Sequence, residues 1–189
     1  STSPIVDCGV HYVDVMCQMT KSKPKYVNAI GVNLTDEIKK DMYNYGHLQV
    51  VFENGSIGWY EAGWGPMISE TAFFVKDVVG PKGSVSIVEP NSKGEIKSDK
   101  IDSHTKTSSL LIHNQDRDEN GKFINDDIVI NTKTEPDHLE LCLLEQKHLL
   151  DVIQNDLDVD SDLDDVISSM KIVLAADKSI KSGKQVKVL

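Results

Sequence analysis

The sequence contains one arginine, few aromatic residues and no long apolar run. Its 189 residues carry 20 Lys and Arg against 30 Asp and Glu, a formal net charge of −10, and Arg117 is the only arginine. Nucleic-acid phosphates need a basic face, so this balance argues against a nucleic-acid partner. No apolar run reaches the roughly 18 residues of a membrane span. The first residues also lack the basic and hydrophobic regions of a secretory signal. We therefore expect neither a membrane partner nor secretion.

Cysteine is scarce, and the usual phosphate-binding glycine motifs are missing. The three cysteines, Cys8, Cys17 and Cys142, form no CxxC pair. This argues against a disulfide scaffold or a cysteine-based zinc site and predicts a reducing, cytoplasmic location. Neither GxGxxG nor GxxxxGK[ST] occurs in the sequence. By itself, therefore, this chain cannot bind a dinucleotide in the Rossmann manner, and we expect no cofactor to be bound by this chain alone.

The patterns that are present predict a helix, then a series of strands, then two helices. Apolar residues at helical spacing predict the first helix from about Val6 to Met19. β-rich runs predict strands at residues 26–34, 47–53, 56–64, 71–79 and 84–89, and shorter strands near 94–101 and 108–113. Adjacent strands without crossovers pair antiparallel. We therefore expect a single α+β domain over residues 1–189, with a largely antiparallel open sheet and helices packed on one face.

Short local signals predict where several of these elements begin and end. Asn54-Gly55 lies between two strand runs and predicts a type I′ turn, in which both central residues take positive φ. Pro136 fits the start of the first closing helix. Ser161 and Asp164 resemble a capping box for the second closing helix. Residues 185–189 can add a terminal strand.

Asp7 and His11 are the strongest candidates for chemistry. They lie one helical turn apart in the first predicted helix. A carboxylate beside an imidazole can orient the ring and hold its proton, which suits general acid–base work near neutral pH. Gly9, between them, would let a ligand or another backbone come close. The plainer interpretation is an N-capping aspartate followed by a polar helix face, and the pattern alone favours it.

The other polar and aromatic candidates are weaker. The acidic run from Asp156 to Asp165 lacks the glycine and the glutamate of a calcium loop, so we interpret it as a solvated linker. Trp64 suits a pocket mouth and the packing of a sheet face equally well. We interpret the remaining histidines as structural or surface residues and predict no metal site; these are His47, His104, His113, His138 and His148.

Four stretches in order resemble the C-terminal domain of the Gfo/Idh/MocA oxidoreductases. The segment Asp7-Cys-Gly-Val-His-Tyr-Val-Asp14 is similar to the D-x-G-x-H-x-x-D motif that opens that domain. Residues 48–58 resemble the family's hairpin with an Asn-Gly tip, and residues 80–87 resemble its G-x-x-G strand entry. Residues 164–176, with Gly183, resemble its final helix and exit. The resemblance covers nearly the whole chain.

This resemblance implies a role for the chain within a larger enzyme. A Rossmann domain ahead of it would bind NAD or NADP, and the full-length protein would act on a hydroxyl of a sugar, polyol or related compound. Asp7 would orient and polarise the His11 imidazole, and His11 would exchange a proton with the substrate hydroxyl. Asp14 and Trp64 would contact the substrate. The lysine of the family's E-K-P motif lies in the cofactor domain, so we expect the isolated domain to be inactive.

One face of the predicted sheet is left without helices. An antiparallel sheet covered by helices on one face leaves the other face to be covered. We expect a homodimer or higher oligomer through that face, where Trp59, Phe73 and Val75 would lie.

One rival function is a non-catalytic sugar-binding or dimerisation module with the same fold. A stand-alone hydrolase is weaker, because no nucleophile is evident.

Overall fold

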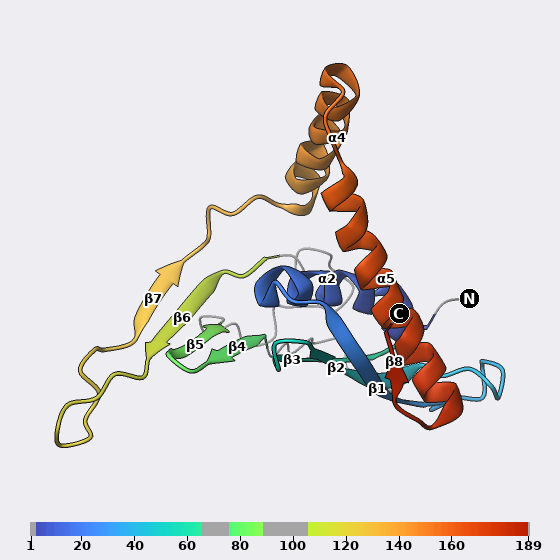
Figure 1. Cartoon of the computed structure of the whole chain (residues 1–189), viewed down its shortest axis with the longest axis horizontal. Helices are drawn as coiled ribbons and strands as arrows, with labels where there is room; N and C mark the ends of the chain where they lie inside the picture. The colour runs from blue at the N-terminus through green and yellow to red at the C-terminus, as the bar shows by residue number, and fades with distance from the viewer. Residues whose placement is uncertain (1–2, 66–75, 89–105, 189) are drawn as a thin grey trace. The chain divides into compact units, whose positions relative to one another are not determined.

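The computed structural model describes residues 3–65, 76–88 and 106–188, apart from the side chain of Ser161. The chain divides into two compact units. The first comprises Ser1–Ile68 and Leu157–Leu189, and the second comprises Ser69–Asp156. Figure 1 labels the helices and strands. The single domain expected from the sequence stays a prediction.

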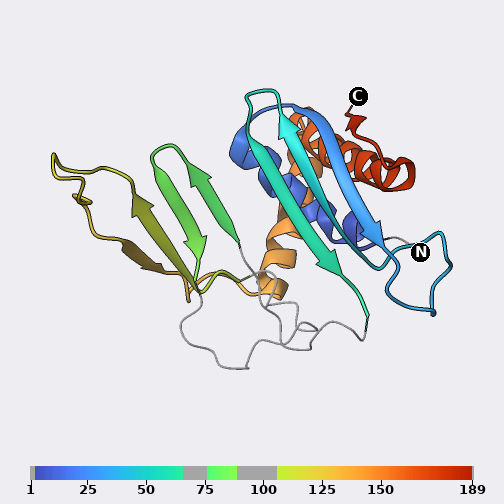
Figure 2. The same ribbon diagram turned by 90° about the horizontal axis from the view of Figure 1, so that it is seen from below.

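The first unit contains one antiparallel sheet, with strands in the order β3-β2-β1-β8 (Figure 2). Its elements are α1 Pro4–Asp7, α2 Gly9–Thr20, β1 Pro24–Val32, β2 Tyr45–Phe52, β3 Ile57–Gly63, α5 Asp160–Ser182 and β8 Val186–Lys187. The β1, β2, β3 and β8 runs expected from the sequence are all present, and the helices α1, α2 and α5 pack on the sheet.

The core of this unit lies between the sheet and its helices. Along β2, Leu48, Val50 and Phe52 are buried at every second position, as expected for a strand with one covered face. On α5, Ile172 and Val173 are fully buried against this layer. The remaining buried hydrophobic residues are Ile5, Val13, Val27, Ala29, Tyr43, Ala175 and Ala176.

The opposite face of the same sheet is exposed, and large apolar side chains lie on it beside polar ones such as Gln49 and Glu61. Ile30, Val32, Ile57 and Trp59 lie on it, and Trp59 is 58% exposed. The structure therefore places Trp59 on the open face, as the sequence predicted. Phe73 and Val75 lie outside the described residues. That a second copy covers this face stays a prediction.

Two local predictions in this unit are wrong in detail. Instead of one helix from Val6 to Met19, two segments meet at Cys8, and Lys21 in the left-handed region ends the second (φ 47°). The β2–β3 turn is not type I′, because Gly55 (φ 86°) but not Asn54 has positive φ. Asn54 is held from outside the hairpin: its N–H donates to Ser22 Oγ and its side-chain amide to the Thr20 carbonyl. These bonds tie the tip of the hairpin to the end of α2, while the Gly55 N–H closes the turn on the Phe52 carbonyl at 3.0 Å.

The second unit contains a four-stranded antiparallel sheet in the order β4-β5-β6-β7. Its elements are β4 Asp77–Gly80, β5 Gly83–Ile87, β6 Ser109–Asn114, β7 Ile128–Asn131 and the helix α4 His138–Asn155. The strand expected at residues 71–79 is described only at its end, and the one near 94–101 lies outside the described residues. Within the described part of this unit, Ser109 is the only buried residue.

The two closing helices start differently from the prediction. Asp137, rather than Pro136, caps α4, in a capping box with Glu140. The capping box predicted at Ser161 and Asp164 is wrong, because α5 begins at Asp160 after Val159, without a side-chain cap. The Asp158 carboxylate accepts the Asp160 N–H at 2.9 Å, and the helix starts two residues earlier than an N-cap at Ser161 would place it.

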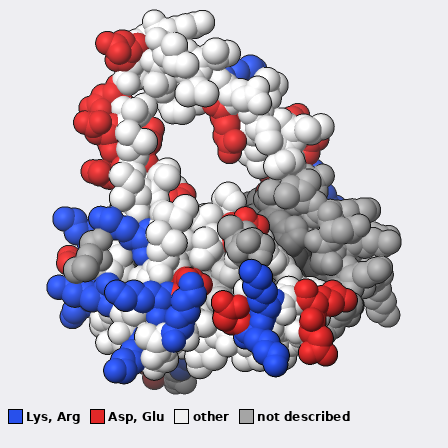
Figure 3. Space-filling model, turned by 90° about the vertical axis from the view of Figure 1, so that its right-hand side faces the viewer, with Lys and Arg blue, Asp and Glu red and all other residues white. Residues whose placement is uncertain are grey.

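The α+β class with antiparallel strands is confirmed by the two sheets and their helices. Among the described helices, none is both long and apolar enough to cross a membrane. On the face shown in Figure 3, lysines lie beside Asp and Glu side chains, so charge of both signs is present there.

Candidate functional site

Asp7 and His11 lie on either side of the junction between α1 and α2. Ser3 begins α1 by accepting the Val6 N–H on its Oγ at 3.2 Å, and Asp7 is the last residue of that helix. Cys8 keeps right-handed helical angles (φ −84°, ψ −35°), so the chain continues into α2 with little change of direction. Asp7 and His11 are both exposed, and no hydrogen bond joins them in the described part of the chain.

Aromatic rings close the space behind this junction. A Cβ on the buried Gly9 would lie 3.0 Å from Tyr60 Cε1. The close approach that Gly9 permits is therefore used by the Tyr60 ring of β3. Tyr12 stacks on the same ring, with 5.0 Å between centroids and 24° between planes. The junction thus has an aromatic wall, formed by Tyr12 and Tyr60.

Cys8 and Trp64 lie close to this aromatic wall, as the causes of the pKa shifts of Cys8 and Tyr60 indicate. Burial raises the pKa of the Cys8 thiol, and the Asp7 charge raises it further, while a hydrogen bond with Trp64 lowers it. Burial also raises the pKa of Tyr60, with smaller contributions from Cys8, Tyr12 and Asp7. A thiol with a raised pKa is protonated near neutral pH and is a poor nucleophile. Cys8 therefore acts here as a packed neighbour of Asp7.

Asp14, one turn beyond His11, is bonded within the chain. Its Oδ1 accepts the Ser169 hydroxyl of α5 at 3.0 Å, and its Oδ2 accepts the Gln18 amide at 2.9 Å. Ser169 is only 2% exposed. These bonds make Asp14 a bridge between α2 and α5. A contact from Asp14 to substrate stays a prediction.

The backbone of Trp64 is held by Asn44, a residue that the sequence patterns do not single out. The Trp64 N–H donates to the Asn44 carbonyl at 2.7 Å, and the Asn44 side-chain amide donates to the Trp64 carbonyl at 2.8 Å. Asn44 is 5% exposed and Trp64 is 37% exposed. The structure thus brings Trp64 to the Asp7 end of the motif, with part of its indole open to solvent.

Among the described residues, the side chains that could hold a metal ion or a dinucleotide are few. The loop between β6 and β7 has the spacing of a calcium loop at Asp116, Asp118, Asn120, Gly121 and, in place of glutamate, Asp127. Asp127, however, pairs with His113 at 2.7 Å. No group of three His, Cys, Asp or Glu side chains in the described ranges could hold a metal ion. The strand pairs described are antiparallel and the sequence lacks a glycine-rich phosphate loop, so these residues do not fit a dinucleotide cradle.

Known proteins share this sequence pattern and fold. Residues 1–188 match the family model described as "Oxidoreductase family, C-terminal alpha/beta domain". Levoglucosan dehydrogenase in complex with NADH and levoglucosan is 15% identical, with a TM-score of 0.67 over 96% of this chain and 49% of that one. An oxidoreductase from Agrobacterium radiobacter, in complex with NAD+, L-tartaric acid and magnesium, is also 15% identical, with a TM-score of 0.66 over 97% and 48%.

A third solved structure extends this set. The WlbA dehydrogenase from Bordetella pertussis, in complex with NADH and UDP-GlcNAcA, is 14% identical, with a TM-score of 0.61 over 100% of this chain and 46% of that one. No curated protein sequence matches the chain. The chain therefore spans about half the length of the solved structures it resembles.

Proposed function

Because the chain belongs to the C-terminal alpha/beta domain family of the Gfo/Idh/MocA oxidoreductases, we propose that it is the substrate domain of an NAD- or NADP-dependent dehydrogenase. The nicotinamide cofactor would be bound by a Rossmann domain outside this chain, because these residues form no cradle for it. The relatives that hold levoglucosan and UDP-GlcNAcA support a sugar, polyol or related hydroxy compound as substrate.

One observation carries this proposal: Asp7 and His11 are exposed at a helix junction whose other side is closed by the aromatic wall and Trp64. An exposed imidazole can accept the proton of a substrate hydroxyl at a ring nitrogen and return it in the reverse direction. Asp7, one turn before it, would orient the reacting groups. The partly exposed Trp64 indole offers an apolar surface to a sugar ring.

The test uses the full-length protein with its cofactor domain. His11→Ala removes the proton acceptor and should lower kcat about 100-fold or more, and Asp7→Asn should lower it as well. His148→Ala, which removes an exposed histidine of α4 in the other unit, is the matched control and should leave kcat unchanged. Steady-state rates with a panel of sugars and polyols provide the measurement.

The rival function is a non-catalytic sugar-binding or dimerisation module with this fold. It predicts that His11→Ala leaves any dehydrogenase activity unchanged while sugar binding persists. The proposal also predicts a reading frame that extends upstream of Ser1 and encodes a GxGxxG after its first strand. A frame without such a segment would contradict it. The free cysteines of the described chain, Cys8, Cys17 and Cys142, support a cytoplasmic location.

A further inference from the structure

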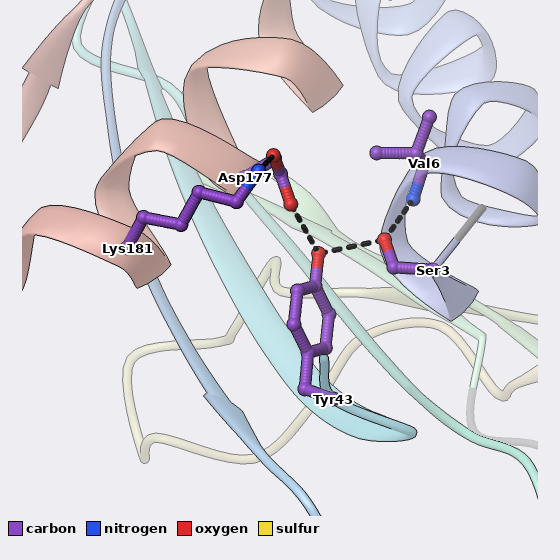
Figure 4. Close-up of polar contacts among 5 residues, drawn as sticks. All are labelled: Ser3, Val6, Tyr43, Asp177 and Lys181. Atoms are coloured by element: carbon purple, nitrogen blue, oxygen red, sulfur yellow. Dashed lines mark hydrogen bonds and ion pairs between the residues drawn. The ribbon is translucent and has the colours of Figure 1, made fainter. Parts of the chain in front are cut away.

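Tyr43, in the loop between β1 and β2, connects three distant parts of the first unit. Its hydroxyl hydrogen-bonds both Ser3 Oγ, at 2.6 Å, and Asp177 Oδ1 of α5, at 3.2 Å (Figure 4). Lys181 donates to the other Asp177 oxygen at 2.6 Å. The Tyr43 ring is 8% exposed and lies over Gly31, where a Cβ would come within 2.8 Å of it. Tyr43 is therefore fixed both by packing and by hydrogen bonds.

The Ser3 end of this connection leads directly to Asp7. Ser3 Oγ accepts the Val6 N–H at 3.2 Å, and the Ser3 carbonyl accepts the Asp7 N–H at 2.9 Å. Because α1 is a single turn, these bonds determine where its last residue lies. A displacement of Ser3 would be passed on to the Asp7 carboxylate. The Tyr43 hydroxyl thus contacts Ser3, forty residues away in the sequence, whose carbonyl accepts the Asp7 N–H.

The next residue, Asn44, fixes the other side of the site. It exchanges two hydrogen bonds with the Trp64 backbone, at 2.7 and 2.8 Å, and its Oδ1 accepts the Leu34 N–H at 2.8 Å. Trp64 also lies close enough to Cys8, the neighbour of Asp7, to lower the pKa of its thiol. The bonds therefore run from Asp7 through Ser3 and Tyr43, and from the next residue, Asn44, to Trp64.

We propose that Tyr43 and Asn44 are the positioning residues of the candidate site, Tyr43 acting through Ser3 on Asp7 and Asn44 acting on Trp64. Their roles in turnover rest on the proposed function. A hydrophobic pair would fill the same space without these bonds. Two buried polar residues whose bonds end at the two sides of the site specify its geometry as well as its stability. Burial raises the pKa of Tyr43 to about 12, so its hydroxyl keeps its proton near neutral pH.

The first experiment measures geometry in the 189-residue chain and needs no activity. Tyr43→Phe removes the hydroxyl alone, and a lost hydrogen bond of about 1 kcal/mol should speed amide exchange at Val6 and Asp7 about fivefold. Exchange at Ile172, in the core, should follow only the global stability. Tyr45→Phe, which removes a hydroxyl bonded to Glu61 on the opposite sheet face, is the control. Equal changes at Val6, Asp7 and Ile172 would overturn the inference.

The positioning role of Asn44 is tested with a variant that changes only the side-chain amide. Asn44→Asp keeps an acceptor for the Leu34 N–H but removes the amide donor to the Trp64 carbonyl. It should shift the Trp64 indole N–H resonance, assigned with Trp59→Phe, and leave the Asp7 amide unchanged. If the Trp64 indole resonance does not shift in a folded Asn44→Asp protein, the positioning role of Asn44 is overturned.

The second experiment separates the role of Tyr43 from that of Asn44 by steady-state kinetics in the full-length protein. Tyr43→Phe should lower kcat about tenfold with KM nearly unchanged, because it disturbs Asp7. Asn44→Asp should mainly raise KM, because it disturbs Trp64. Restoration is tested at Ser3, where Ser3→Thr should recover the kcat that Ser3→Ala loses. If the exchange results hold but neither His11→Ala nor Tyr43→Phe alters kcat, the Tyr43 hydroxyl does hold Asp7 in place and the proposed function fails. If His11→Ala lowers kcat and Tyr43→Phe does not, the positioning role fails.

Discussion

The first unit buries twelve hydrophobic side chains, whereas the described residues of the second bury none. The sheet of the first unit has three helices packed on it, so one face lies in a core. In the second unit the edge strands β4 and β7 are exposed at every position. A sheet of a few strands needs another layer for stability. The first unit therefore carries its own core, and we expect the stability of the second to depend on the layer that covers it.

The closing helices show the same contrast. The helix α5 buries Ile172, Val173 and Ala176 in the core, so its C-terminal half is held by tertiary packing. The helix α4 buries no residue, and Leu139 near its start is 77% exposed. The clearest stabilising feature of α4 is local, namely the capping box of Asp137 and Glu140. The apolar face of α4 is thus available to a covering layer.

The largest predicted effect tests where the stability lies. Phe52→Ala removes a ring that is 1% exposed and should lower the free energy of unfolding by about 3–5 kcal/mol. Ile130→Ala, at a position that is 42% exposed in β7, should cost less than about 1 kcal/mol. Urea unfolding of the 189-residue chain gives both values. Similar losses for the two variants would remove the contrast between the units.

The comparison also shows which parts of the fold were predictable. Strand positions followed from alternation and turn residues, and Gly183 correctly predicted the end of α5, where it has φ 63°. The type I′ turn failed because the Gly55 N–H donates to the Phe52 carbonyl, which makes Glu53 and Asn54 the central residues of the turn. The capping box of α5 failed because the helix begins at Asp160, whose N–H the Asp158 carboxylate accepts. Local patterns thus predicted the elements but not the residues at which they turn or begin.

The site was predictable only where its residues are close in sequence. Asp7 and His11 are four residues apart, so helical spacing alone could pair them. Trp64 was a candidate, but its place beside Cys8 depends on Asn44, twenty residues earlier in a loop without periodicity. Tyr43 gave no signal at all, since its bonds reach forty residues back and more than a hundred forward. Such contacts become visible only once the chain is folded.

A smaller effect is expected at the open face of the first sheet. If a second copy covers it, Trp59→Glu places a charge in the centre of an apolar interface. Losing a tryptophan hot spot costs about 2 kcal/mol or more, which weakens dimerisation at least about 30-fold. Sedimentation or light scattering at micromolar concentration measures the change. Val79→Glu, at a position 79% exposed in the second unit, is the matched control. The prediction is contradicted if the wild-type chain is monomeric. It is also contradicted if Val79→Glu, and not Trp59→Glu, lowers the measured mass.

The smallest predicted effects distinguish the units by pH. Burial raises the pKa of Tyr43 from 10.0 to about 12, so the folded state favours the neutral phenol. Because the folded pKa lies above the unfolded one, this contribution to stability is complete below pH 10 and is lost as the pH rises towards about 12. Tyr43→Phe should therefore flatten the alkaline part of the stability profile, and Glu135→Gln should leave that part unchanged.

Glu135, in the second unit, should act at the opposite end of the pH range. Burial on its own would raise its pKa, but hydrogen bonds from Ser108 and Thr107 and the Lys106 charge lower it below 4.5. Its folded pKa is depressed, so its contribution is present above the unfolded value and is lost as the pH falls through the folded one. The difference between wild type and Glu135→Gln in urea unfolding should therefore shrink in acid and persist in alkali. A difference that instead shrinks above pH 10 would contradict this assignment, because Glu135 is already fully ionised there.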